Sequence, residues 1–270
     1  MKRYYDKVKN RLVYIGKKAS SSFWDDHWNI DNLKKAVEAN KNNRFILNST
    51  KMFLQKGKIL EAGCGIGDNV YCLHHNGYSA FGVDFAENTV KKTNSLFPEL
   101  NITKGDVRNL KFEDAFFDGY WSLGVIEHFY EGYKDILNEI QRVTKKGGYV
   151  FLTFPYLSPL RRLKVRFGIY NKFIEDNCDL KNFYQFIFDD KMVKHDFEKK
   201  GFILRYMKPK GGLKGLKDEV LVLKPILQRL YDYNGQNRFI KYFRFLINKH
   251  LAFFTGHTIL MILEKTRYII

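Results

Sequence analysis

The feature that most constrains this chain is an alternation of short apolar runs with helix-period segments between Lys58 and Phe154. This alternation is typical of a parallel sheet that is covered by helices on both faces. It predicts strands at 58–63, 79–84, 100–105, 117–123 and 148–154, separated by helices at 68–76, 86–97 and 133–144. A helix at 190–200 leads into a further strand, FILRYMK, and an apolar strand, HTILMILEK, comes last.

The chain length of 270 residues suits one α/β domain with insertions. We predict an N-terminal helical lid or extension at 1–57, followed by the main domain at 58–270. Two basic, aromatic segments, at about 157–188 and 209–254, read as insertions, and the second reads as mainly helical. No repeat or low-complexity linker marks a second independent domain.

The strongest local signal is KILEAGCGIGDNV, in which a strand opens into three glycines before a helix. Gly63, Gly65 and Gly67 permit a sharp turn and a close approach of a ligand to the backbone. A dinucleotide-binding loop would carry its third glycine one position later, where this chain has Asp68. The loop therefore predicts a nucleoside ligand without a pyrophosphate.

Acidic residues end the next two strands. Asp84 ends SAFGVD, and Asp106 with Val107 follows the strand after it. Because the ends of parallel strands share one crevice, Asp84 can accept hydrogen bonds from both hydroxyls of a ribose. The Asp106 carboxylate and the Val107 amide suit the edge of an adenine. The alternative is that these residues only form turns, with Asp84 as a helix cap. That alternative explains less well why the glycine loop, Asp84 and Asp106 end three consecutive strands.

These stretches resemble the class I S-adenosylmethionine-dependent methyltransferases, in particular the small-molecule group that includes the ubiquinone and menaquinone biosynthesis enzymes. The similarity runs from ILEAGCGIG through FGVDFAENTV and KGDVRNLKF to LNEIQRVTKKGGYVFLTFP. It implies a doubly wound, Rossmann-like α/β sheet of seven strands, mostly parallel with the last antiparallel, and S-adenosylmethionine as cofactor. The residues implied to hold that cofactor are Glu61, Gly63, Cys64, Gly65, Gly67, Asp84, Phe85, Asp106, Val107 and Ser122.

Two histidines are candidates for a catalytic base, which a hydroxyl acceptor would require. His128 follows the fourth strand in GVIEH, where similar proteins often carry Glu-His in a structural or cofactor-supporting role. His27 lies in SFWDDHWNI of the expected lid, whose Trp24 and Trp28 are expected to pack over the cofactor. No HxxxH, CxxC or carboxylate-histidine cluster indicates a metal, so we predict metal-independent activity.

Acceptor selection is expected to reside in the insertions. Beside Trp28, the candidate substrate contacts are Tyr184, Arg161 and Arg162. The basic amphipathic stretch at 236–250 can either lie on an anionic membrane surface or pack its apolar face on the domain. The acceptor is predicted to be a small molecule, a carbohydrate or a lipid-linked compound.

The net charge of +17 is uneven, because residues 58–144 carry more acidic than basic side chains while the flanking segments are basic. This charge leaves open an RNA or protein methyltransferase, although LGVIEH lacks the Asn/Asp-Pro-Pro-Tyr/Phe pattern of amino-group methylases. A non-catalytic S-adenosylmethionine-binding protein is a further alternative. Three dispersed cysteines and the absence of a signal-peptide core predict a cytoplasmic protein, at most peripheral to the membrane.

Overall fold

The computed structural model describes residues 1–266, and its largest element is a sheet of seven strands. These strands are β3 (Lys58–Ala62), β4 (Ser79–Asp84), β5 (Asn101–Lys104), β6 (Phe117–Leu123), β7 (Thr144–Pro155), β10 (Phe202–Lys210) and β11 (Thr258–Lys265). Their order is β5-β4-β3-β6-β7-β11-β10, and β11 alone runs antiparallel to its neighbours. The predicted fold class and all seven strands are confirmed.

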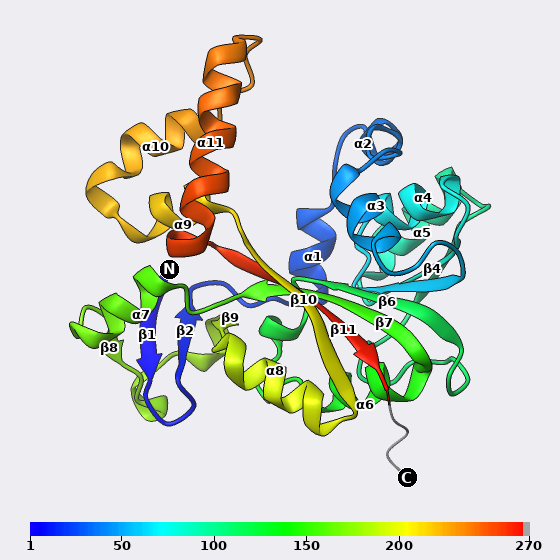
Figure 1. Cartoon of the computed structure of the whole chain (residues 1–270), viewed down its shortest axis with the longest axis horizontal. Helices are drawn as coiled ribbons and strands as arrows, with labels where there is room; N and C mark the ends of the chain where they lie inside the picture. Colours follow the sequence, from blue (N-terminus) through cyan, green and yellow to red (C-terminus); the bar gives the residue numbers. More distant parts are fainter. Residues whose placement is uncertain (267–270) are drawn as a thin grey trace.

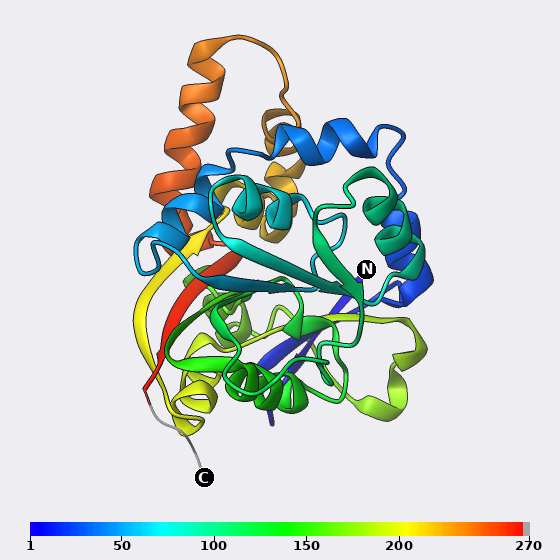
Figure 2. The same cartoon turned by 90° about the vertical axis from the view of Figure 1, so that its right-hand side faces the viewer.

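Helices cover both faces of this sheet, as Figure 2 shows. One face carries α2 (Leu33–Ala39), α3 (Arg44–Lys51), α4 (Asp68–His75) and α5 (Glu87–Leu96), and the other carries α6 (Lys134–Val143) and α8 (Asp190–Lys199). Neighbouring strand residues point to opposite faces. Accordingly Ile59 packs in the core with Val70 of α4, whereas Leu60 packs with Ile140 of α6.

A second, four-stranded sheet has the order β8-β1-β2-β9. Its strands are β1 (Lys2–Asp6), β2 (Arg11–Ile15), β8 (Asn171–Lys172) and β9 (Phe183–Ile187). The helical expectation for 1–57 is therefore wrong for residues 2–15, which form a hairpin; α1 (Ser21–His27), α2 and α3 follow it. The hairpin pairs with strands of the 157–188 insertion, which also contains α7 (Pro159–Arg166).

The turn of the β1–β2 hairpin is held by the Asp6 side chain. The carboxylate accepts hydrogen bonds from the backbone amides of Val8 and Lys9, each at 3.1 Å, and from Arg11 Nε at 3.0 Å. Asn10 adopts a left-handed φ of 43°, which asparagine tolerates better than most residues. Residues close in sequence thus determine the turn. The strand β9, which pairs with β2, lies far along the chain, so hydrophobic periodicity does not reveal the four-stranded sheet.

Arg161 and Arg162, two of the four expected acceptor contacts, belong to buried and half-buried ion pairs of the scaffold. Arg161 is fully buried and donates to Glu219 Oε1 at 2.9 Å and to the carbonyls of Tyr156 and His257. Arg162 binds Asp189, with 3.0 Å between Nη2 and Oδ1. A buried guanidinium needs acceptors for its donors, and here the protein supplies them. Neither arginine lines the main cavity described below.

The segment after β10 forms a helical arm, which we define as α9 (Gly212–Glu219), α10 (Lys224–Tyr231) and α11 (Arg238–Thr255). Figure 1 shows α10 and α11 projecting from the body of the molecule. This confirms the helical insertion predicted after strand six. Within residues 1–266, no helix combines the length and apolar character needed to cross a bilayer.

Glu219, at the end of α9, ties the arm to the body. Its side chain accepts from Lys164 at 2.7 Å and from the Tyr170 hydroxyl at 2.6 Å, and it lies 3.3 Å from Arg3. Burial by itself would raise the pKa of Glu219, but the positive charges of Arg161 and Arg3 and these hydrogen bonds lower it to about 2. Glu219 therefore stays ionised in the folded protein and joins three separate chain segments.

We expect Glu219→Gln to lower the free energy of unfolding by about 3–5 kcal/mol at pH 7, because it leaves buried Arg161 without its charge partner. The folded pKa lies below the ordinary value of 4.5, so this contribution is present above pH 4.5 and is lost as the pH falls toward 2. Urea denaturation at several pH values measures it. Glu264→Gln, which breaks the more exposed pair with Arg205, is the control and should cost less than about 1 kcal/mol. Equal losses in the two variants would contradict the assignment.

Candidate active site

A cavity of about 690 Å³ lies at the carboxyl ends of the parallel strands. Its inner wall is formed by residues that end or follow β3, β4 and β5: Gly63, Asp84, Phe85, Asp106, Val107 and Arg108. Its outer wall comes from the segment after β6, from α1 and from the 157–188 insertion. Ligands of doubly wound sheets bind at this edge, where consecutive strand ends meet.

The glycine loop after β3 has the backbone that the sequence predicts. Gly63 has a φ of 80° and Gly65 a φ of 50°, both in the left-handed region. A Cβ on Gly63 would stand 2.5 Å from a Val125 methyl, and one on Gly65 would stand 2.7 Å from the Trp28 ring. Only glycine fits these two positions, because a side chain would clash with Val125 or Trp28 and would strain the backbone.

Asp84 holds this loop in place. One carboxylate oxygen accepts from the Gly65 amide at 2.7 Å, and the other accepts from the Ala86 amide at 2.9 Å. Burial raises the pKa of Asp84, and the hydrogen bonds from Ala86 and Gly65 oppose that rise. Each oxygen retains acceptor capacity toward the cavity, which suits the two hydroxyls of a ribose.

Asp106 and Val107 also reach the cavity, but Asp106 is already engaged. Arg108 Nη2 lies 2.6 Å from Asp106 Oδ2, and this contact lowers the pKa of Asp106. The guanidinium also lies over the Phe129 ring, 5.1 Å from its centre. An adenine amine would therefore share the Asp106 carboxylate with Arg108, a residue that sequence reasoning did not select.

Five of the expected cofactor residues do not line the cavity but lie behind its wall: Glu61, Cys64, Gly65, Gly67 and Ser122. Glu61 is buried, with Oε1 accepting from Asn69 at 2.8 Å and Oε2 without a hydrogen-bond partner among residues 1–266. Burial raises the pKa of Glu61 well above its ordinary value. Ser122 is buried with its hydroxyl unpartnered in the same range, and Cys64 and Gly67 lie within the loop turn. The unmet acceptor on Glu61 fits a donor group of a ligand or a water beside the loop.

The helix α1 is fixed to the edge of the cavity. Asp25 accepts from the amide and the hydroxyl of Thr89, at 3.0 and 2.9 Å, and so satisfies the N-terminus of α5. Ser21 donates to the Phe85 carbonyl at 3.2 Å. Trp24 and Trp28 line the cavity as expected for this segment, whereas His27 is exposed and outside its wall.

His128 lines the cavity with a defined tautomer. Its Nδ1 lies 2.7 Å from the Tyr184 carbonyl, an acceptor, so Nδ1 carries the proton and Nε2 has a free lone pair. Burial lowers the pKa of His128 to about 4 against the effect of that hydrogen bond. The imidazole is therefore neutral at physiological pH. Tyr184 contributes its carbonyl and its ring, 5.1 Å from the imidazole, but does not line the cavity.

Sequence reasoning missed most of the outer wall. Its apolar members are Leu123, Val125, Phe129, Tyr130, Leu180 and Phe183, and its charged members include Lys18, Glu131, Lys134 and Asp135. Phe129 and Tyr130 directly follow His128, so position alone could have suggested them. Lys18 follows β2 and Leu180 precedes β9, and the pairing of these two strands brings both residues to the cavity. The sequence did not reveal this pairing.

This sheet order, glycine loop and set of strand-end acids define a class I S-adenosylmethionine-dependent methyltransferase architecture. Residues 60–152 match the family model described as "Methyltransferase domain", a range that contains Gly63, Asp84, Asp106 and His128. This part of the chain is therefore similar to a methyltransferase domain, in agreement with the sequence resemblance. No group of three or more His, Cys, Asp or Glu residues suited to a metal occurs in residues 1–266, and metal independence stays a prediction.

The relatives agree with this assignment. Over 131 residues the chain is 34% identical to demethylmenaquinone methyltransferase of Staphylococcus epidermidis, covering 46% of this chain and 54% of that protein. Over 112 residues it is 30% identical to phthiotriol/phenolphthiotriol dimycocerosates methyltransferase of Mycobacterium tuberculosis, covering 40% of each. The chain thus spans about half or less of the length of these curated relatives. A SAM-dependent methyltransferase from Archaeoglobus fulgidus has a similar fold, with a TM-score of 0.51, 18% identity and coverage of 85% of this chain and 94% of that one.

We expect Asp84→Asn to weaken S-adenosylmethionine binding by about 1–3 kcal/mol, because the change removes the charged acceptor for the ribose. Calorimetric titration measures the change. Asp31→Asn, an exposed change outside the cavity wall, is the charge-matched control and should bind as the unchanged protein does. Unaltered affinity in Asp84→Asn, with a normal melting temperature, would exclude Asp84 from the cofactor site.

Proposed function

We propose that the protein transfers the methyl group of S-adenosylmethionine to a small-molecule, carbohydrate or lipid-linked acceptor with an apolar or aromatic part. The observation that carries this proposal is the single cavity that joins an acidic, glycine-lined inner wall to an aromatic outer wall. Two reactants of different chemistry fit such a cavity side by side. The names of the two relatives, both methyltransferases with non-polymeric acceptors, support the same class.

The inner wall would hold the cofactor. Asp84 would accept from the ribose hydroxyls, Asp106 and Val107 would meet the adenine edge, and Phe85 would flank its ring. The Gly63–Gly67 loop, with Glu61 and Cys64 behind it and Ser122 in β6, would receive the methionine part. When bound, S-adenosylmethionine supplies a methyl group that is already activated for displacement as a sulfonium.

The outer wall would orient the acceptor and exclude water. Trp24, Phe129 and Phe183 offer aromatic surface at the rim of the same cavity. His128 Nε2, held by the Nδ1 contact to Tyr184, would accept the proton of an acceptor hydroxyl. Its pKa of about 4 keeps this nitrogen available throughout the physiological pH range.

We further propose that α1, within the 1–57 extension, acts as a lid over the reactants. Its contacts to Thr89 and Phe85 fix one side of the helix, and Trp24 together with the C-cap residue Trp28 lines the cavity. A lid of this kind would contribute by excluding water from the reacting groups.

The cavity does not favour an RNA acceptor. Its charged lining is balanced, with Lys18, Arg108 and Lys134 opposed by Asp84, Asp106, Glu131 and Asp135. Nucleic-acid grooves concentrate positive charge along the path of the phosphates. The excess positive charge of this chain lies elsewhere on its surface, including on α11.

Radiolabelled S-adenosylmethionine, incubated with the protein and cell fractions, tests the proposal. We expect label in an organic-extractable or small-molecule fraction, and we expect it to persist in EDTA. Label in RNA or protein would contradict the acceptor class, and loss in EDTA with recovery on adding magnesium would contradict metal independence. Cofactor binding without any labelled product would instead indicate a non-catalytic protein.

The same assay tests His128. With a hydroxyl acceptor, His128→Ala should lower kcat by about 10²–10⁴-fold and leave cofactor affinity within about twofold. His27→Ala is the matched control, because His27 is exposed and outside the cavity wall. Equal rates for both variants would remove His128 from catalysis while leaving the cofactor assignment intact.

A further inference from the structure

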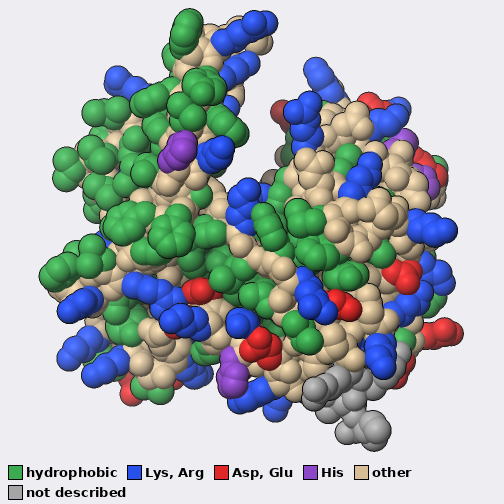
Figure 3. Space-filling view, viewed as in Figure 1, with side chains coloured by type: hydrophobic (Ala, Val, Ile, Leu, Met, Phe, Trp, Pro, Cys, Tyr) green, Lys and Arg blue, Asp and Glu red, His purple; other side chains and the backbone are tan. Residues whose placement is uncertain are grey.

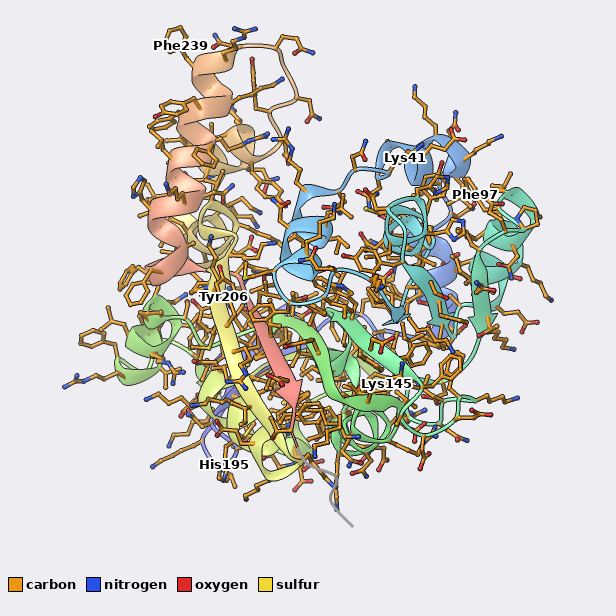
Figure 4. The ribbon with its side chains drawn as sticks, turned by 45° about the vertical axis from the view of Figure 1, so that its right-hand side comes forward. Lys41, Phe97, Lys145, His195, Tyr206 and Phe239 are labelled. Atoms are coloured by element: carbon orange, nitrogen blue, oxygen red, sulfur yellow. The ribbon has the colours of Figure 1, made fainter. Side chains whose placement is uncertain are left out.

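The helix α11 turns aromatic side chains toward solvent. The exposed fractions are 84% for Phe239, 76% for Phe253 and 62% for Tyr242, and Phe243 is also more than half exposed. Their spacing of three or four residues, continued through Leu246 and His250, places them along one side of the helix. Figure 3 shows apolar side chains gathered over the projecting arm, and Figure 4 shows Phe239 at its far end. Surface helices normally turn such a stripe toward the core.

The opposite side of α11 packs on α9 through small residues. A Cβ on Gly215 would meet the Thr255 carbonyl at 1.6 Å, and one on Gly212 would meet the Ala252 amide at 2.6 Å. Thr255 donates to the Gly212 carbonyl at 2.7 Å, and Asn248 accepts from the Leu213 amide at 3.0 Å. The base of the arm is thus closely packed without using the exposed aromatic residues.

A second exposed apolar site lies at the start of α10. Val222 is 88% exposed, and Leu221 and Ile226 are each 70% exposed. The turn between α10 and α11 is held by Arg244, which donates to the Tyr233 carbonyl at 2.8 Å. The arm is therefore an ordered helical hairpin with solvent-facing apolar groups on both of its helices.

Positive charge borders these apolar groups. The helix α11 carries Arg238, Lys241, Arg244 and Lys249 and has no acidic residue, and α10 adds Lys224 and Arg229. Within residues 1–266, no cation of α10 or α11 takes part in an ion pair. Aromatic side chains that insert at an interface, bordered by cations, are suited to an anionic lipid surface.

We propose that the α9–α11 arm docks the protein on an anionic bilayer surface, with Phe239, Phe253 and the 221–223 turn inserted among the headgroups. A second copy of the chain fits this face less well, because pairing two arms would bring cations against cations. The arm begins at the carboxyl end of β10, which runs parallel to β7, so it leaves the sheet at the same edge as the cavity. Docking would thus bring the cavity edge toward lipid. The inference does not depend on methyl transfer, since it concerns binding alone.

Vesicle co-sedimentation of the full chain tests the proposal. We expect binding to vesicles of equal parts phosphatidylglycerol and phosphatidylcholine, weakened by salt, and much weaker binding to phosphatidylcholine alone. Phe239→Gln with Phe253→Gln should reduce binding by about tenfold or more. Arg238→Gln with Lys249→Gln should reduce it by about thirtyfold.

Matched changes off the arm serve as controls. Phe167→Gln removes another exposed aromatic ring, and Lys34→Gln with Lys35→Gln removes the same charge from α2. These controls should bind as the unchanged protein does, and all variants should keep its melting temperature as evidence of folding. Unreduced vesicle binding by both arm variants, or equal binding to neutral vesicles, would overturn the proposal. So would a stable dimer in light scattering that the two phenylalanine changes dissociate, which would assign this face to a second copy.

Discussion

The pair of hydrogen bonds made by the Asp84 carboxylate is the interaction on which the site depends. By accepting from Gly65 at 2.7 Å and from Ala86 at 2.9 Å, one side chain at the end of β4 sets both the β3–α4 turn and the start of α5. At the start of α5, the Thr89 amide donates to Asp25 of α1. The β4–α5 connection therefore also positions α1 at the edge of the cavity. A buried carboxylate with capacity left for further donors is thus the centre of the scaffold and of the inner wall.

The main sheet and the inner wall could be predicted because their signals are local. Apolar runs, glycines and strand-end acids occur within a few residues of one another, and the strand ends of such a sheet meet by geometry. The small sheet could not be predicted, because β2 pairs with a strand about 170 residues away. Arg161 was predicted to contact the acceptor for a related reason, because only the fold brings Glu219 to it. In the sequence, a basic residue of an aromatic segment looks the same whether it contacts a ligand or forms a buried ion pair. Arg108 was missed because nothing in its neighbours distinguishes an arginine that binds Asp106 from a solvated one.

Charge and apolar surface are distributed in complementary ways over the molecule. Close to the body, basic residues such as Arg161 and Lys164 form ion pairs with Glu219. On the outer part of the arm, the cations have no ionic partner within residues 1–266, and aromatic rings lie beside them in solvent. The cavity itself is balanced in charge and aromatic at its rim. The positive charge on α10 and α11 therefore lies outside the cavity and belongs to the surface that we propose as the docking face.

We propose that the inner wall of the cavity is a site for S-adenosylmethionine. Direct calorimetric titration of the purified chain with S-adenosylmethionine, S-adenosylhomocysteine and NAD tests it most directly. We expect saturable one-to-one binding of the first two compounds and no measurable binding of NAD, since Asp68 stands where a dinucleotide-binding loop requires glycine. Binding of NAD without binding of S-adenosylmethionine would contradict it.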